Sequence, residues 1–282
     1  MIKRRDVLKS AMAIAGSNFL RPIQALALRN PAAESRKMDF QTFLPRHFDG
    51  KPFGPAELTA LEDEAGIDRF VVFPETTSRP DNAALAEAIK SRPRMIGGAS
   101  INPTLGSESV KALETAIRDL GLKGVRLSPA VHRYPIDAEI VFPLMEKAQT
   151  LDIPVTIDAD VEFCKPSQIA VVAGRFPRLR IILDMGFRAP VRPPGEPAGK
   201  EMAETVARCP NLYLGLTALT TCQPAYLMST IWVGGPERVL FGSNAPSGIP
   251  LFAVKGITWA ALGKEAESLI FEKNLKKIYK LG

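Results

Sequence analysis

Two aspartates stand at the ends of short apolar runs in this sequence, where a parallel sheet would bring them together. Asp158 follows one run and Asp184 follows the next. Two carboxylates held close raise the pKa of one of them, and such a pair can act as an acid and a base. The alternative is that each aspartate is neutralised by an arginine or capped by backbone amides.

Arginine and aromatic side chains occur near the same places. Arg126 lies in one apolar run and Arg188 follows another. A guanidinium group grips a carboxylate with two parallel hydrogen bonds, so we expect a small acidic ligand, with structural ion pairs as the competing explanation. Tyr134 would frame an aromatic ligand or pack in the core. The other polar side chains expected to line this pocket are Gln41, Glu75, Asn102, Ser128, Asp160, Thr217 and Asn244.

The elements that would position these side chains alternate along the chain. Apolar runs with little internal alternation are typical of strands buried on both faces. The predicted strands are Met38–Leu44, Arg69–Pro74, Met95–Ile101, Gly124–Leu127, Val155–Ile157, Arg180–Leu183, Leu212–Leu216 and Val239–Gly242. The predicted helices are Pro55–Ala65, Asp81–Lys90, Ser107–Leu120, Ala138–Leu151, Ser167–Phe176, Gly199–Cys209, Gln223–Val233 and Ala266–Tyr279.

This alternation predicts a parallel α/β fold, which we interpret as a single-domain (β/α)8 TIM barrel over residues 38–282. A closed barrel fits the strand count better than an open sheet, and no G-x-G-x-x-G follows any strand. The carboxyl ends of the strands then form one face, where barrels of this kind place their active sites. The Pro-rich run Arg188–Gly199 would be a long loop on that face.

The first 37 residues have the pattern of an export signal and a short linker. Arg4 and Arg5 precede a weakly apolar stretch from Ala11 to Leu20, and Ala-Leu-Ala ending at Ala27 follows. This order is that of a cleavable signal peptide, and the paired arginines resemble a twin-arginine signal. We expect cleavage after Ala27 and a periplasmic protein without a membrane span. A basic leader on a cytosolic protein is the alternative.

The charge distribution argues against nucleic acid as a partner. Residues 1–37 carry eight Lys or Arg and two Asp or Glu, so the formal charge of +6 falls in this segment. The remaining residues hold equal numbers of the two signs. Phosphate binding needs clustered cations, and the body of the chain has no basic stripe.

Several of these segments, in order, resemble the amidohydrolase-related family, which includes decarboxylases and hydrolases of small carboxylated substrates. The segment 38–44 (MDFQTFL) is similar to the family's I-D-x-H-x-H-L, and 121–129 (GLKGVRLSP) to G-x-K-G-V-K-L-H-P. The segment 177–186 resembles P-x-L-x-x-x-L-x-H-x-G, and 241–246 (FGSNAP) resembles F-G-S-D-x-P. The resemblance covers about residues 38–281 and implies the same barrel.

The positions that the family uses to hold a divalent metal are changed in this sequence. Family members place histidines and a final aspartate there; the matching residues here are Gln41, Phe43, Asp158, Asp184 and Asn244. Phenylalanine has no ligating atom, and zinc sites depend mostly on imidazole and thiolate. We therefore expect no metal and no cofactor.

Three functions remain open from the sequence. The first is a metal-independent hydrolase or lyase acting on a small carboxylated molecule. Asp158 and Asp184 would exchange protons, and Asn244 or Gln41 would donate to a developing oxyanion. The second is an inactive barrel that binds a small ligand or a partner protein. The third is a metal-dependent hydrolase with a site rebuilt from carboxylates. A homo-oligomer is also compatible with the sequence.

Overall fold

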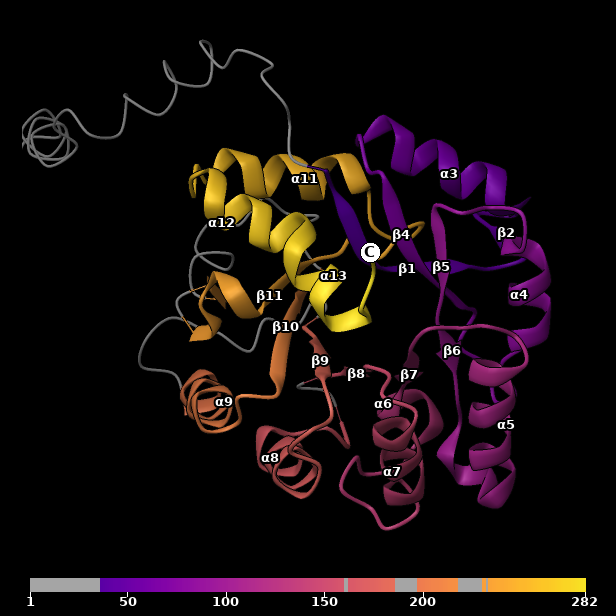
Figure 1. Ribbon diagram of the computed structural model, residues 1–282, viewed down its shortest axis with the longest axis vertical. Helices are drawn as coiled ribbons and strands as arrows, with labels where there is room; N and C mark the ends of the chain where they lie inside the picture. The colour runs from indigo at the N-terminus through magenta and orange to yellow at the C-terminus, as the bar shows by residue number, and fades with distance from the viewer. Residues whose placement is uncertain (1–35, 160–161, 186–196, 218–229, 232) are drawn as a thin grey trace, which may run out of the picture. The chain divides into compact units, whose positions relative to one another are not determined.

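Short parallel strands follow one another around the core of this protein, and helices pack on their outer side (Figure 1). The computed structural model describes residues 36–159, 162–185, 197–217, 230–231 and 233–282. The parallel strands are β1 (Met38–Leu44), β4 (Arg69–Pro74), β5 (Met95–Gly97), β6 (Ala99–Ser100), β7 (Val125–Leu127), β8 (Val155–Asp158), β9 (Ile181–Asp184), β10 (Leu212–Leu216) and β11 (Val239–Phe241). A small antiparallel hairpin pairs β2 (His47–Phe48) with β3 (Lys51–Pro52).

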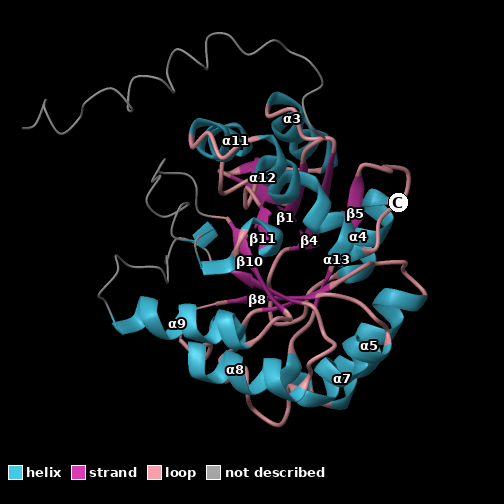
Figure 2. Ribbon diagram, turned by 60° about the vertical axis from the view of Figure 1, so that its left-hand side comes forward, coloured by secondary structure: helices cyan, strands magenta, loops and turns pink. Residues whose placement is uncertain are grey.

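Helices connect successive strands, and Figure 2 shows α5, α7, α8 and α9 along the outside of the sheet. The α-helices are α3 (Pro55–Glu64), α4 (Asn82–Ile89), α5 (Ser107–Arg118), α6 (Pro129–His132), α7 (Phe142–Thr150), α8 (Pro166–Arg175), α9 (Pro197–Arg208), α11 (Pro250–Trp259), α12 (Lys264–Ser268) and α13 (Asn274–Tyr279). Two 3₁₀ turns, η1 (Pro103–Leu105) and η3 (Pro236–Arg238), and a π-helical turn, η4 (Leu269–Lys273), complete the elements.

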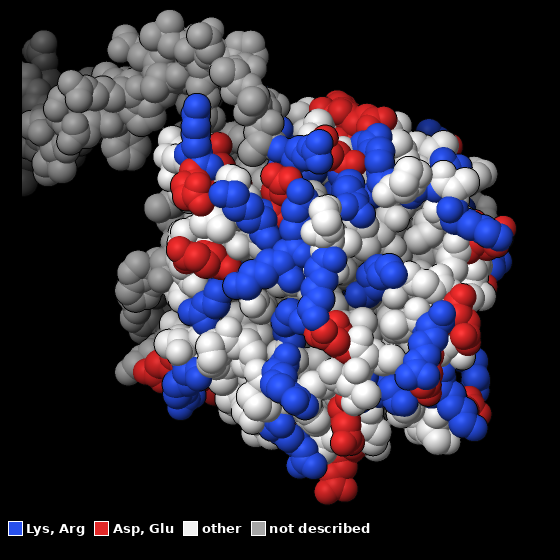
Figure 3. All heavy atoms as spheres, in the orientation of Figure 1, with Lys and Arg blue, Asp and Glu red and all other residues white. Residues whose placement is uncertain are grey.

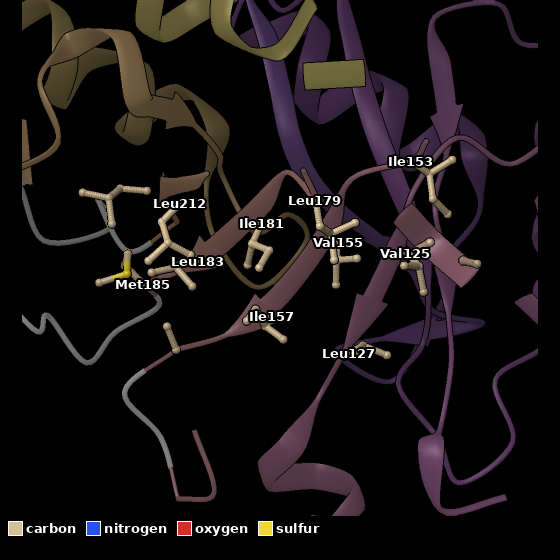
Figure 4. Close-up of a cluster of buried hydrophobic side chains, with 14 of the residues drawn as sticks. Val125, Leu127, Ile153, Val155, Ile157, Leu179, Ile181, Leu183, Met185 and Leu212 are labelled. Carbon is tan, nitrogen blue, oxygen red and sulfur yellow. The ribbon is translucent and has the colours of Figure 1, made fainter. Parts of the chain in front are cut away.

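Side chains alternate along each strand between an outer and an inner hydrophobic cluster. Figure 4 shows the outer set on β7 to β10, which includes Val155, Ile157 and Ile181 and packs against the helices. The inner set includes Phe40 and Ile182, together with side chains of α13. Because successive residues of a strand face opposite sides, residues next to the outer set face the barrel interior.

The ring closes through two irregular joints. Strands β5 and β6 are separated by Gly98, where a Cβ would lie 2.3 Å from the Phe73 ring, so only glycine fits. β5 pairs with β4, whereas β6 pairs with β7. At the other joint, the Phe43 N–H donates to Ala245 O (2.8 Å) and the Asn244 N–H donates to Gln41 O (3.0 Å), which joins β1 to the end of β11.

The predicted barrel class is confirmed, and each predicted strand overlaps an observed one, except that the predicted strand Met95–Ile101 is divided at Gly98 into β5 and β6. The predicted final helix, Ala266–Tyr279, is divided into α12, η4 and α13, and α11 lies where no helix was predicted. Most of the predicted helix Gln223–Val233 falls outside the described residues.

Within the described part of the chain, no helix is long and apolar enough to cross a membrane. Figure 3 shows both signs of charge on the visible face.

Candidate functional site

Five polar side chains gather around one guanidinium group at the carboxyl ends of the strands. Arg126 lies in the middle of β7, and its neighbours Val125 and Leu127 belong to the outer cluster, so its side chain points into the barrel. It is 6 % exposed. We name the group around it the Arg126 cluster; its members are Gln41, Arg126, Asp158, Asp184, Thr217 and Asn244.

The guanidinium nitrogens donate to three side chains that come from three different strands. Nη1 donates to Gln41 Oε1 on β1, which lies across the barrel from β7. Nη2 donates both to Asp158 Oδ1 on β8 and to Asp184 Oδ2 on β9, the latter at 3.0 Å. Arg126 thus forms ion pairs with both aspartates through Nη2, whereas its buried Nε has no hydrogen-bond partner among the described residues.

The two aspartates are direct neighbours in the sheet. Asp158 pairs with Asp184 in the parallel register of β8 and β9, and both face the interior. The side chain of Asp158 is 18 % exposed and that of Asp184 is 8 % exposed. The sequence predicted this proximity, and the arginine pairing that it left open as an alternative is also present.

Asp184 is held on both carboxylate oxygens. Its Oδ1 accepts from the Thr217 hydroxyl, and its Oδ2 accepts from Gln41 Nε2 at 2.5 Å as well as from Arg126. Gln41 Nε2 also donates to Asn244 Oδ1 at 3.1 Å. Asn244 has a φ of +63°, a left-handed conformation that asparagine tolerates better than most residues. The amides of Gln41 and Asn244 therefore extend the network to the joint between β1 and β11.

The electrostatic environment distinguishes the charged groups of the cluster. Burial raises the pKa of Asp158 and the charge of Asp184 raises it further, whereas Arg126 and Ser128 lower it; the net direction is upward. Burial lowers the pKa of Arg126, but the two aspartates outweigh this effect and raise it. Arg126 is therefore a permanent cation, and Asp158 is the member that exchanges a proton more readily than an exposed aspartate would near neutral pH.

Aromatic rings cover the guanidinium on another side. The Arg126 Cζ atom lies 5.0 Å from the centre of the Phe43 ring and 6.0 Å from that of Phe73. A ring face attracts a cation, most strongly where water is excluded. Phe43 thus contacts the cation of the cluster.

A buried carboxyl group beneath the cluster was missed by the sequence analysis. Asp39 is 0 % exposed; its Oδ1 accepts from the Gln41 N–H and its Oδ2 from the Ser243 N–H, each at 2.8 Å. It thereby fixes the backbone on both sides of the joint between β1 and β11. Burial raises its pKa to about 7. The sequence offered one signal for this role, because Asp39 is a charged residue at the second position of the predicted strand Met38–Leu44.

Tyr134 and Ser128 lie beside Asp158. Tyr134 is 2 % exposed, and burial together with the charge of Asp158 raises its pKa well above the usual value. Ser128 is 1 % exposed and lowers the pKa of Asp158 through its side chain. Both side chains are therefore near the cluster, although neither is open to solvent.

Other predicted site residues lie elsewhere. Glu75 is exposed and lines a lateral pocket of about 450 Å³ between the ends of β1 and β4, the hairpin, α3 and α4. None of the Arg126 cluster lines that pocket. Asn102 caps η1, where its Oδ1 accepts from the Thr104 N–H at 3.1 Å. Arg188 and Asp160 fall outside the described residues.

The side chains present do not fit a divalent metal. Phe43 has no ligating atom and presents its ring to a guanidinium group, and oxygens of Asp158 and Asp184 are directed at the same group. Over the described ranges, no three His, Cys, Asp or Glu side chains are grouped as a metal site would require. We therefore derive no step through a metal.

Comparison with solved structures shows the same barrel in several other proteins. An uncharacterised TIM-barrel protein from Bordetella bronchiseptica is 20 % identical with a TM-score of 0.71, covering 87 % of this chain and 99 % of its own. A probable 2-pyrone-4,6-dicarboxylic acid hydrolase from Acinetobacter baumannii, with citric acid bound, is 15 % identical with a TM-score of 0.69 and the same coverage. A 2,6-dihydroxybenzoate decarboxylase from Rhizobium is 18 % identical with a TM-score of 0.66, covering 88 % and 99 %.

Sequence comparison identifies the family directly. No curated protein matches the chain significantly. The family model described as amidohydrolase matches residues 28–281, which is nearly the whole chain. This chain belongs to the amidohydrolase family.

Proposed function

We propose that this protein is a metal-independent hydrolase or lyase acting on a small carboxylated molecule, with Asp158 as the group that exchanges a proton. The observation that carries the proposal is the sharing of one Arg126 nitrogen by two aspartates in direct register. Asp184 is held on both oxygens, whereas Asp158 retains solvent access. Asp158 is therefore the aspartate that can take up a proton from water and pass it to a ligand.

The substrate class is drawn from the structural neighbours, whose names specify a dihydroxybenzoate and a pyrone dicarboxylate. In a decarboxylation, the bond to the carboxylate breaks, its electron pair stays on the ring carbon, and carbon dioxide leaves. Protonated Asp158 would supply the proton to that carbon and recover one from solvent. In a hydrolysis, ionised Asp158 would instead accept a proton from the attacking water. The Asn244 amide would donate to a developing oxyanion, whereas Gln41 Nε2 already donates to Asp184 and Asn244.

The proposal is tested by turnover of 2,6-dihydroxybenzoate and 2-pyrone-4,6-dicarboxylate in the presence of a chelator. Carbon dioxide release or loss of the pyrone absorbance is measured for the native protein and for Asp158→Asn. We expect chelator-resistant turnover that falls by at least about 100-fold in the variant, because general acid–base catalysis contributes that much. Asp119→Asn, at an exposed carboxyl that follows α5, is the matched control and should retain full activity.

Two results would count against this function. Turnover that the chelator abolishes and a divalent metal restores would favour the rebuilt metal site. Equal rates for the native protein and Asp158→Asn would remove Asp158 from the mechanism. For decarboxylation, activity should fall as the pH rises through the raised pKa of Asp158, because the protonated form is the acid.

A ligand-binding barrel without catalysis is the second candidate. It is favoured by the internal pairing of Gln41 and Asp184 with the terminal nitrogens of Arg126, which holds these groups together without a substrate. A carboxylated ligand that raises the melting temperature and is not consumed would support it.

For the N-terminal segment we propose twin-arginine export and a periplasmic location; the N-terminal sequence of protein recovered from the periplasm tests cleavage after Ala27.

A further inference from the structure

We propose that the Arg126 guanidinium is the resident cation of this barrel, built into the chain at the point where the family pattern would gather a metal ion. The proposal does not depend on catalysis, because it concerns which positive charge holds the strand ends together. It follows from the direction in which the polar and aromatic groups of the cluster point.

The changed positions of the family pattern converge on this one cation. Gln41, Asp158 and Asp184 each accept directly from a guanidinium nitrogen, and Asn244 is joined through Gln41. The fifth changed position, Phe43, presents its ring to the same group at 5.0 Å. A carboxylate, an amide oxygen and a ring face are all groups that attract a guanidinium ion.

The shape of the cation also fits this set better than a metal does. A guanidinium group is planar and donates in fixed directions, so it can serve acceptors on β1, β8 and β9 together. Two carboxylates and one guanidinium leave a buried centre with at most one excess negative charge. Without Arg126, the carboxylates of Asp158 and Asp184 would face each other without a compensating positive charge.

Removing the Arg126 side chain should therefore create a cavity that binds free guanidinium ion. In Arg126→Ala, the oxygens of Asp158, Asp184 and Gln41 would surround the vacated space. Breaking a buried ion pair by removing one partner is strongly destabilising, and for a chain of this size we expect a loss of about 10 °C in melting temperature. Guanidinium ion that binds only the folded variant should restore part of that loss.

The experiment measures melting temperatures of the full chain in millimolar guanidinium chloride, far below denaturing concentrations, against sodium chloride of the same ionic strength. We expect guanidinium to raise the melting temperature of Arg126→Ala by several degrees and to leave the native protein unchanged. Arg175→Ala is the matched control, because Arg175 is exposed and its guanidinium also lies over a ring, Phe142, at 4.2 Å. Arg175→Ala should show neither the fall in melting temperature nor its recovery in guanidinium chloride.

A second pair of variants keeps the test decisive if Arg126→Ala does not fold. Arg126→Lys retains a cation without the planar fork, and Arg126→Met fills similar space without charge. A cation centre predicts that the lysine variant melts several degrees above the methionine variant, and that the gap shrinks when Asp158→Asn is added to both. Equal melting temperatures, or rescue of Arg126→Ala by sodium as well as by guanidinium, would overturn the proposal. These readouts involve no substrate, so they fail separately from the proposed activity.

Discussion

Replacing Glu62 by glutamine is expected to stabilise this protein near neutral pH and to have little effect in mild acid. Glu62 lies on α3, is 0 % exposed, and neither of its carboxylate oxygens has a hydrogen-bond partner among the described residues. Burial raises its pKa well above 4.5, and the charge of Asp39 raises it further. The folded protein therefore holds a proton on Glu62 that the unfolded chain releases as the pH rises.

The size of the effect follows from that one proton. A group whose pKa is raised by folding contributes stability below its unfolded pKa and loses it as the pH rises toward the folded pKa. Each such proton lowers the free energy of unfolding by about 1.4 kcal/mol per pH unit in this interval. For each pH unit between about 4.5 and the raised folded pKa, Glu62→Gln should therefore gain up to about 1.4 kcal/mol relative to the native protein. Asp39, whose pKa burial raises to about 7, adds a slope of the same sign to both proteins.

Urea denaturation at a series of pH values gives the free energy of unfolding for both proteins. Glu64→Gln on the same helix is the control, because Glu64 is exposed, and its curve should run parallel to that of the native protein. Parallel curves for Glu62→Gln and the native protein would refute the reasoning, since they would mean that Glu62 titrates in the folded state as it does in the unfolded chain.

Two further predictions concern packing and a buried amide. Gly215→Ala should lower the free energy of unfolding by about 1–3 kcal/mol in urea denaturation, because its Cβ would lie 2.2 Å from the Phe40 ring. Gly174→Ala in α8, with nothing within 4 Å of its Cβ, should instead raise it by about 0.5–1 kcal/mol; two losses of equal size would contradict this packing argument. Asn274→Ala should lower the melting temperature by several degrees in calorimetry, because Asn274 Nδ2 donates to Pro236 O (2.7 Å) and Val239 O (2.8 Å); an unchanged melting temperature would show that water replaces the amide.

The barrel could be predicted from the sequence because its signals are local. Runs such as Val155–Ile157 are apolar on both faces of a strand, and helices such as α5 carry apolar residues at helical spacing. The helix α11 was missed because its sequence, PLFAVKGITW, is apolar around most of its surface and contains a glycine. Such a stretch lacks the amphipathic spacing that identifies a helix.

The candidate site could be predicted only where the order of the strands determines which side chains lie close together. Asp158 and Asp184 end neighbouring strands, so their proximity follows from the barrel. The choice between an acid–base pair and arginine neutralisation depends on where the Arg126 side chain reaches, and no sequence pattern gives that direction. The role of Asp39 depends on a bulge in β1 and on Ser243, 204 positions away.

The joint between β1 and β11 has a consequence for biosynthesis. Gln41 and Asn244, which meet at this joint, are 203 positions apart. Because chains leave the ribosome from their N-terminus, Gln41 is synthesised early. Most of the remaining chain must follow before Asn244, its partner at the joint, has been synthesised. A nascent chain can assemble β7 to β9, with Arg126 between its two aspartates, but it cannot complete the centre. The Arg126 cluster is thus among the last features to form, after the residues that carry Asn244 have been synthesised.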